Sequence, residues 1–304
     1  MKMDSKTAEK YVKAGKILGS VQKKARKSAV ADKKLLDIAL VVEKAVKDLS
    51  EGKAKLAFPV NLSLNEAAAH YTPGTGDETV LGKNDVLKID IGVHIDGFIA
   101  DGSFTVNPSN EWANLIEASE LALENALSIA KLGLEIGKIG TEIEKTIKGK
   151  GFKPVQNLTG HGLEQYVQHA APGIPNIENN DTRKLEDGQA YAFEPFATDG
   201  EGIVREGAQS EIFAVEEARL IRNNHARNVL EFILENYNTL PFAERWIADG
   251  LKMSEFQRKI GLRELLKAKC IKAFPVLKEE QGKMVSQAEN SIIIHEGKVI
   301  KLIK

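Results

Sequence analysis

The sequence lacks several features that would place the protein outside the ordinary globular class. Its 304 residues include a single cysteine, Cys270, so an internal disulfide is excluded and a reducing compartment is favoured. No apolar run approaches the roughly 20 residues of a membrane-spanning helix, and the lysine-rich beginning lacks the apolar core of a signal peptide. We therefore expect a cytoplasmic protein that has no membrane partner.

An excess of charge of either sign is also missing. Lysine and arginine together number 42 and aspartate and glutamate 43, which leaves a formal net charge of −1. Such a balance gives no electrostatic case for nucleic acid as the main ligand. The many lysines near the beginning are interpreted as a solvated helix face.

Hydrophobic residues make up 42% of the chain, which is enough for a large core, and their spacing predicts two pairs of helices. Helical periodicity covers residues 5–29 and 32–50, and it returns at 111–132 and 141–151. Each pair is followed by strand-like sequence, and this repeated order predicts two related halves. Helices that cover one side of a mainly antiparallel sheet give an α+β fold.

Residues 85–106 show the alternation of β-strands in two runs, VLKIDIGV and GFIADGSFTV, which are joined by the turn-like HIDG. This pattern predicts a β-hairpin. A turn centred between Ile95 and Asp96 would make Asp90 and Asp101 directly opposed neighbours, about 5 Å apart at their side-chain roots. Two partly buried carboxylates at that separation repel, so they need a cation or a shared proton.

Three further residues with metal-binding side chains, His161, Glu194 and Glu289, lie in or at the ends of strand-like sequence. Glu194 is flanked by apolar residues in YAFEPF, so this acid needs a partner at the end of a buried strand. With Asp90 and Asp101 they make four carboxylates and one imidazole, a set that suits two divalent ions such as Mn²⁺, Fe²⁺, Co²⁺ or Zn²⁺. Because local spacing cannot join ligands so far apart, a structural role for each of them stays open.

Other histidines and acids have ordinary explanations. His94, Asp96 and Asp85 lie in or beside the hairpin and are interpreted as turn or solvent residues. His70 lies just upstream of the hairpin in a segment that prolines interrupt, and a lone histidine is more often structural than catalytic.

Taken together, the blocks around these residues resemble the methionine aminopeptidases, metallopeptidases of the pita-bread fold, over nearly the whole chain. The blocks that carry the resemblance are AAAHYTPG, VLKIDIGVHIDGFIADGSFTV, NLTGHGLEQYVQHA, AYAFEPFATDGEG and SQAENSIII. Each block is weak alone, whereas the ordered set is specific. The helical sequence before the last glutamate resembles the insertion of the type 2 branch, and the short N-terminal segment resembles the archaeal type.

This resemblance implies a pita-bread fold with two related halves and an inserted subdomain similar to winged-helix folds. The expected catalytic domain comprises residues 1–202 and 283–304, and the helical insertion comprises residues 203–282. Within the insertion, Ser254 and Gln257 are expected to form a helix capping box.

The resemblance also assigns the metal ligands by position. It implies that Asp90 chelates one of two divalent ions, and that Asp101 and Glu289 bridge both. His161 and Glu194 would complete the coordination of the other ion.

Catalytic and substrate-binding residues follow from the same resemblance. Glu194 would also shuttle a proton, while His70 and His169 would contact the substrate and stabilise the tetrahedral intermediate. Phe58 and Phe274 would line the pocket for the methionine side chain, because aromatic walls suit a flexible thioether.

The implied activity is removal of the initiator methionine from nascent proteins when the second residue is small and uncharged. A water molecule activated by the two metal ions would attack the first peptide bond. Gln168 stands where an apolar pocket residue is familiar from the human type 2 enzyme, so side-chain selectivity is expected to differ. The expected partners are the N-terminal methionine of nascent polypeptides and, transiently, the ribosome, and the expected state is a monomer. The large second residue, Lys2, predicts that the chain keeps its own Met1.

Two other hypotheses remain at this stage. One is a related dinuclear peptidase that cuts before proline, against which the helical insertion and the AAAHYTPG block argue. The other is a non-catalytic binding protein on the same fold, against which the presence of all five ligand residues argues.

Overall fold

The computed structural model describes residues 3–304. Met1 and Lys2, and with them the expected retention of Met1, lie outside the described residues. The helices are α1 (Ser5–Ser28), α2 (Leu35–Leu49), α3 (Ala113–Ile129), α4 (Ile136–Gly149), α5 (Asn224–Tyr237), α6 (Glu244–Gly250) and α7 (Glu255–Lys267). No helix within residues 3–304 is long and apolar enough to cross a membrane.

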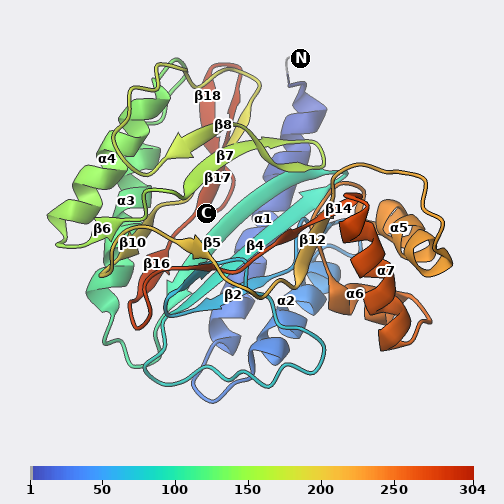
Figure 1. Cartoon of the computed structure of the whole chain (residues 1–304). Coiled ribbons are helices and arrows are strands. Elements are labelled where there is room, and N and C mark those ends of the chain that lie inside the picture. The colour runs from blue at the N-terminus through green and yellow to red at the C-terminus, as the bar shows by residue number, and fades with distance from the viewer. Residues whose placement is uncertain (1–2) are drawn as a thin grey trace.

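Two antiparallel sheets form the middle of the molecule (Figure 1). The first has the order β1-β4-β2, and β5 pairs with β4. Its strands are β1 (Lys55–Leu56), β2 (Asn61–Leu64), β4 (Leu87–Ile95) and β5 (Phe98–Val106). The second has the order β18-β17-β9-β7-β8. Its strands are β7 (Thr159–Glu164), β8 (Val167–Pro175), β9 (Ala190–Phe193), β17 (Asn290–His295) and β18 (Lys298–Lys301).

Three smaller antiparallel sheets surround these two, with the orders β16-β10-β6, β11-β15-β3 and β13-β12-β14. Their strands are β3 (Ala67–Ala69), β6 (Lys153–Pro154), β10 (Phe196–Thr198), β11 (Arg205–Glu206), β12 (Ile212–Val215), β13 (Phe242–Ala243), β14 (Ile271–Phe274), β15 (Leu277–Lys278) and β16 (Val285–Gln287).

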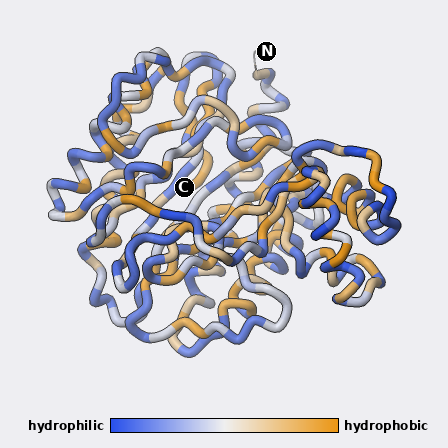
Figure 2. Tube along the Cα trace, viewed as in Figure 1, coloured by the Kyte–Doolittle hydropathy of each residue, from blue (hydrophilic) through white to orange (hydrophobic). Residues whose placement is uncertain are grey.

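Each central sheet has its own pair of helices, as the repeated order of elements predicts. Helices α1 and α2 pack on the first sheet and share one hydrophobic core with β4 and β5. Helices α3 and α4 share a second core with β9 and β17. In Figure 2 the outer helices alternate hydrophobic and hydrophilic residues along the trace, as helices with one buried face do. The predicted α+β fold with two related halves is confirmed.

The predicted β-hairpin is present as β4 and β5, but the predicted pairing within it is wrong. Asp90 lies opposite Ser103 rather than opposite Asp101. The reason is the turn, where Asp96 has φ 50° and Gly97 has φ 84°. Two successive positive φ angles are typical of a type I′ turn, and they centre the turn one residue later than predicted. Because side chains alternate along a strand, Asp90 and Asp101 still lie on one face of the sheet, as diagonal neighbours.

Helix α4 begins earlier than its sequence predicts, at Ile136 instead of Thr141. Glycine is a poor helix former, so Gly137 and Gly140 kept the first turn of α4 from being predicted as helix. The structure needs both glycines for packing. A Cβ at Gly140 would overlap the carbonyl oxygen of Ile177, and one at Gly137 would press on the segment around Asn179.

The two central sheets meet where β5 lies beside β17. The hydroxyl of Ser291 accepts a hydrogen bond from the Asp101 amide at 2.8 Å and donates one to the Asp101 carbonyl at 2.6 Å. The Glu289 amide donates to the Ser103 carbonyl at 3.1 Å. These bonds hold two acids from distant parts of the sequence, Asp101 and Glu289, at the same seam.

The segment from 203 to 282 contains α5, α6 and α7, which lie together at one side of the molecule, away from α3 and α4 (Figure 1). Ser254 and Gln257 form the predicted capping box at the start of α7. The expectation of a purely helical segment was incomplete, because it also contains the sheet β13-β12-β14. These helices and strands share a hydrophobic core of their own. Strand β15 pairs with β3 and so joins this segment to the rest of the chain.

Candidate metal centre

A cavity of about 260 Å³ opens between the two halves of the molecule. All five residues predicted as metal ligands line it, and they come from five strands or strand ends of both central sheets. They are Asp90 on β4, Asp101 on β5, His161 on β7, Glu194 directly after β9 and Glu289 directly before β17. The structure therefore brings together residues that the sequence places far apart.

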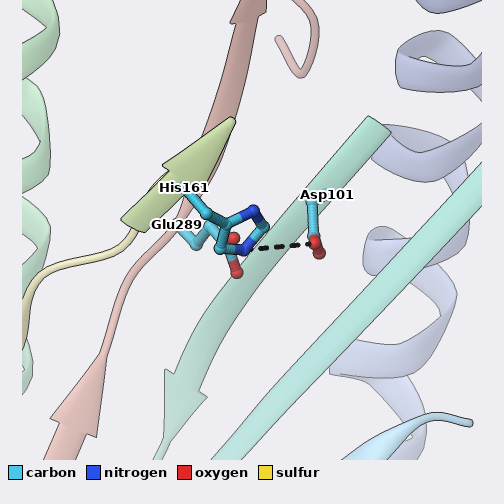
Figure 3. A group of neighbouring side chains, drawn as sticks. All are labelled: Asp101, His161 and Glu289. Carbon is cyan, nitrogen blue, oxygen red and sulfur yellow. Dashed lines mark ion pairs between the residues drawn. The ribbon is translucent and has the colours of Figure 1, made fainter. Parts of the chain in front are cut away.

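Three of these side chains form the tightest group. This group consists of Asp101, His161 and Glu289, which are all buried. Each offers one ligand atom, and the three atoms lie within 4.8 Å of one another. Figure 3 shows the two carboxylates and the imidazole pointing toward one another. His161 Nε2 lies 4.0 Å from Asp101 Oδ2 and 3.6 Å from Glu194 Oε1.

The neutral state of the His161 ring makes this arrangement unfavourable without a cation. Burial lowers the pKa of His161 to about 4, so the ring is neutral at pH 7. Its Nδ1 lies 3.1 Å from the carbonyl oxygen of Gly162, and the proton must sit there because a carbonyl only accepts. Nε2 therefore directs a lone pair at two carboxylates.

The four carboxyl groups are also difficult to ionise together without a cation. Burial raises the pKa of Asp90 to about 7. Burial also raises the pKa of Asp101, Glu194 and Glu289 well above the usual range, and the charges of neighbouring acids raise these three further. Such shifts are expected when several acids share one cavity, since ionising each makes the next harder to ionise.

Unpaired atoms support a metal rather than shared protons as the remedy. Within residues 3–304, the buried oxygens Asp90 Oδ1, Asp101 Oδ1 and Glu289 Oε2 have no hydrogen-bond partner. A buried acceptor without a donor is costly, and a divalent cation satisfies several such oxygens at once. Oxygen donors with one imidazole nitrogen suit Mn²⁺, Fe²⁺, Co²⁺ or Zn²⁺. The residues present fit a divalent metal site.

The predicted catalytic and pocket residues line the same cavity. The ring of Phe274 lies 5.6 Å from that of His70 and 6.4 Å from that of His169. His169 also lies edge-on to His161, with ring centroids 4.6 Å apart. Phe58 is buried in the wall of the cavity.

His70 has a backbone conformation that is unusual for a non-glycine residue, with φ 66°. Its Nδ1 lies 3.2 Å from the carbonyl oxygen of Pro275. Burial lowers its pKa to about 4, so its ring is neutral, with the proton on Nδ1 and a lone pair on Nε2. The ring is thus fixed in orientation by a residue 205 positions later in the chain.

Three amide side chains contact or flank the acids. Gln168 Nε2 lies 3.5 Å from Asp101 Oδ2, and Gln287 Nε2 lies 3.5 Å from Glu194 Oε2. Asn61, opposite Asp90 in the sheet, also lines the cavity. Sequence reasoning missed Asn61 and Gln287, although Gln287 stands only two residues before a predicted ligand.

The expectation that His94 is a turn or solvent residue was wrong about its burial. His94 is 7% exposed on β4, and its Nδ1 accepts a hydrogen bond from the Gly97 amide at 3.0 Å. It stabilises the hairpin turn and does not line the cavity of the five predicted ligands. Asp96 is exposed and forms an ion pair with Lys10 at 2.8 Å, in agreement with its interpretation as a turn residue.

Gly92 offers a test of how closely the cavity wall is packed. A Cβ at this position would overlap the ring of Phe58. We expect Gly92→Ala to lower the free energy of unfolding by about 1–3 kcal/mol, the usual cost of overpacking a core. The matched control is Gly149→Ala in α4, where an added Cβ would meet no atom within 4 Å apart from its chain neighbours and the backbone of its own helix. Alanine there should be neutral or stabilising by up to about 1 kcal/mol. Urea unfolding of both variants measures the difference, and equal stabilities would contradict this account of the wall.

A family model and individual relatives both match the sequence of this chain. Residues 9–220 match metallopeptidase family M24. The chain is 45% identical to a methionine aminopeptidase of Pyrococcus abyssi over 293 residues, which is 96% of this chain and 98% of that protein. It is also 45% identical to a methionine aminopeptidase of Thermococcus kodakarensis over 289 residues, with coverage of 95% and 96%.

Solved structures resemble the fold at much lower sequence identity. A thermophilic Arx1 aligns with a TM-score of 0.85 at 17% identity, over 99% of this chain and 91% of that one. A methionine aminopeptidase of Thermotoga maritima aligns with a TM-score of 0.71 at 20% identity, with coverage of 100% and 99%. A prolidase of Pyrococcus furiosus aligns with a TM-score of 0.61 at 16% identity, over 65% of its own length. These neighbours confirm the predicted pita-bread fold.

Proposed function

Because the chain belongs to the methionine aminopeptidases of metallopeptidase family M24, we propose that its cavity holds two divalent ions through Asp90, Asp101, His161, Glu194 and Glu289. The chain removes the N-terminal methionine of polypeptides in a metal-dependent reaction. The observation that carries the ligand assignment is the convergence of these five side chains on one cavity, with three of their oxygens unpaired among residues 3–304.

The proposed division of ligands follows their positions. Asp90 would hold one ion and His161 and Glu194 the other. Asp101 and Glu289 would bridge both. When bound, divalent ions supply Lewis acidity for the peptide carbonyl and make a water molecule nucleophilic near neutral pH.

Glu194 is the proposed proton carrier. It would accept a proton from the attacking water and deliver it to the leaving amine. Its place at the end of β9 fixes its backbone, and Gln287 Nε2, 3.5 Å from Glu194 Oε2, supports the side chain. The Glu194 carboxylate lines the cavity.

His70 and His169 are proposed to act on the peptide group itself. His70 presents Nε2 to the cavity because its Nδ1 faces the Pro275 carbonyl. His169, an exposed residue of β8, can donate a hydrogen bond to the carbonyl oxygen as negative charge develops there. Phe58 and Phe274 are proposed to enclose the methionine side chain.

Residues 203–282 are proposed to form a subdomain inserted into a catalytic domain of residues 1–202 and 283–304. The separate hydrophobic core of α5, α6, α7 and their sheet supports this division. The same segment contributes Phe274 and Ile212 to the wall of the cavity. The subdomain would therefore help to select the substrate, in keeping with a type 2 enzyme.

Nascent polypeptides would be the substrates, with transient ribosome contact by a monomeric, cytoplasmic enzyme. A free, buried cysteine, Cys270, is compatible with a reducing compartment. Sedimentation velocity tests the monomer, and co-sedimentation with ribosomes tests the contact.

The decisive experiment compares three peptides with purified protein that has been supplied with Mn²⁺ or Co²⁺. We expect release of methionine from Met-Ala-Ser and at least about 100-fold slower release from Met-Lys-Ser, because a large charged second residue does not fit a small enclosed site. Mass spectrometry of the products measures both rates. Cleavage of Xaa-Pro peptides with Met-Ala-Ser left intact would contradict this assignment and indicate a peptidase of the prolidase kind.

A further inference from the structure

Three neighbouring strands place a row of polar side chains beside the metal centre. Asn61 on β2 lies opposite Asp90 on β4, which lies opposite Ser103 on β5. Residues in register across a sheet project from the same face. Each of the three has a buried oxygen, Asn61 Oδ1, Asp90 Oδ1 and Ser103 Oγ, for which the described part of the chain offers no hydrogen-bond partner.

Asn61 is the member of this row whose orientation the structure fixes. Its Nδ2 donates a hydrogen bond to the Pro59 carbonyl at 2.9 Å, and only a donor can face that carbonyl. The amide therefore cannot turn over, and Oδ1 must point the other way. The residue is 5% exposed and lines the cavity together with Asp90, whereas Ser103 does not line it.

A buried amide oxygen in this position needs a donor from the ligand. Leaving an acceptor unpaired costs stability, so such an atom is expected to be satisfied in the functional complex. In a methionyl peptide the thioether and the carbonyl are acceptors. The α-amino group is the richest donor, and it belongs to the same residue as the carbonyl that is attacked.

We propose that Asn61 Oδ1 accepts a hydrogen bond from the α-amino group of the substrate. Asn61 lies beside Asp90 in the cavity wall and would in this way recognise the free N-terminus. This inference rests on the proposed function and adds to it a residue that distinguishes a free amine from a blocked one. An amide suits the task because the cavity already contains four carboxylates. A neutral acceptor binds the amine without adding a fifth buried negative charge.

The test measures the binding of two ligands to Zn²⁺-loaded protein by ligand-observed NMR titration. The ligands are methioninamide and 4-(methylthio)butanamide, which is the same molecule without its amino group. We expect the wild-type protein to bind methioninamide more tightly. In Asn61→Leu and Asn61→Ala this preference should fall by about tenfold, the usual effect of losing a hydrogen bond to a charged donor in a dry site.

The ratio of the two dissociation constants separates recognition from a damaged pocket, because a change of shape weakens both ligands alike. Ser103→Ala is the matched control, since it removes another unpaired oxygen of the same row outside the cavity wall, and it should keep the wild-type ratio. Asn61→Ala shows whether an effect of Asn61→Leu comes from the loss of the amide oxygen or from the shape of the leucine side chain. A wild-type ratio in both Asn61 variants would overturn the inference and leave Asn61 Oδ1 with an ordered water only. Failure of the proposed function would look different, because the wild-type protein would then cleave no Met-Ala-Ser and prefer neither ligand.

Discussion

Asp101→Asn should abolish the cleavage of Met-Ala-Ser without unfolding the protein. Asp101 is 1% exposed and is surrounded by His161 and Glu289, and the exchange keeps its shape while it removes one negative charge. As a proposed bridging ligand it would serve both ions, so we expect a decrease in kcat/KM of at least about 10³-fold. Metal analysis after dialysis should find less bound ion. The metal-free variant should melt no lower than the metal-free wild-type protein, because it has one fewer buried acid.

The same hairpin supplies the control for this experiment. Asp96→Asn changes an exposed acid in the turn between the two strands, where asparagine tolerates the positive φ. This variant should keep its metal content and activity within about twofold, since it loses only a surface ion pair. Full activity and full metal content in Asp101→Asn would refute the bridging role.

Removal of the metal should have the second-largest effect, and its influence on stability should depend on pH. Burial raises the pKa of Asp90 to about 7, and it raises the pKa of Asp101, Glu194 and Glu289 as well. Protonated acids therefore stabilise the folded metal-free protein at low pH. The part that Asp90 contributes is fully present below its ordinary pKa of 3.8 and is lost as the pH rises through about 7. A bound cation replaces those protons and prevents the loss.

Thermal melting with and without Zn²⁺ at pH 5.5, 6.5 and 7.5 tests this expectation. The chelated protein should be inactive at every pH. The increase in melting temperature on adding metal should widen from pH 5.5 to 7.5, because fewer protons then compete for the carboxylates. At 100 times the dissociation constant the metal should stabilise the fold by about 2.7 kcal/mol. An increase of the same size at all three pH values would contradict the assignment of these acids as ligands, and Asp101→Asn should show a smaller increase throughout.

Much of the fold could be predicted from the sequence because its elements have strong local patterns. The buried positions of α1 recur at helical spacing, and Ser254 with Gln257 forms a capping box as expected. The hairpin pairing was predicted wrongly because it depends on a turn type, which the φ angles of Asp96 and Gly97 decide. The early start of α4 was missed because tertiary packing there overrides the low helix propensity of glycine.

The candidate site was predictable only in part. Acids in otherwise apolar strands, such as Glu194 in YAFEPF, attract attention in any sequence, and the family resemblance then supplied their grouping. Asn61 and Gln287 carry no such signal, because amides are ordinary in strands. Their significance depends on the register between β2 and β4 and on the distance to Glu194, which only the folded structure gives.

The seam between β5 and β17 bears on the order in which the protein can mature. The Ser291 hydroxyl that holds the backbone of Asp101 lies 190 residues further along the chain, and Glu289 comes from the same late segment. During synthesis the hairpin with Asp90 and Asp101 can form early, but the last carboxylate, Glu289, arrives only after the chain has been made through residue 289. Contacts so distant in sequence also slow folding. Acquisition of metal should therefore follow the docking of β17 against β5, and a translating chain should be inactive before that step.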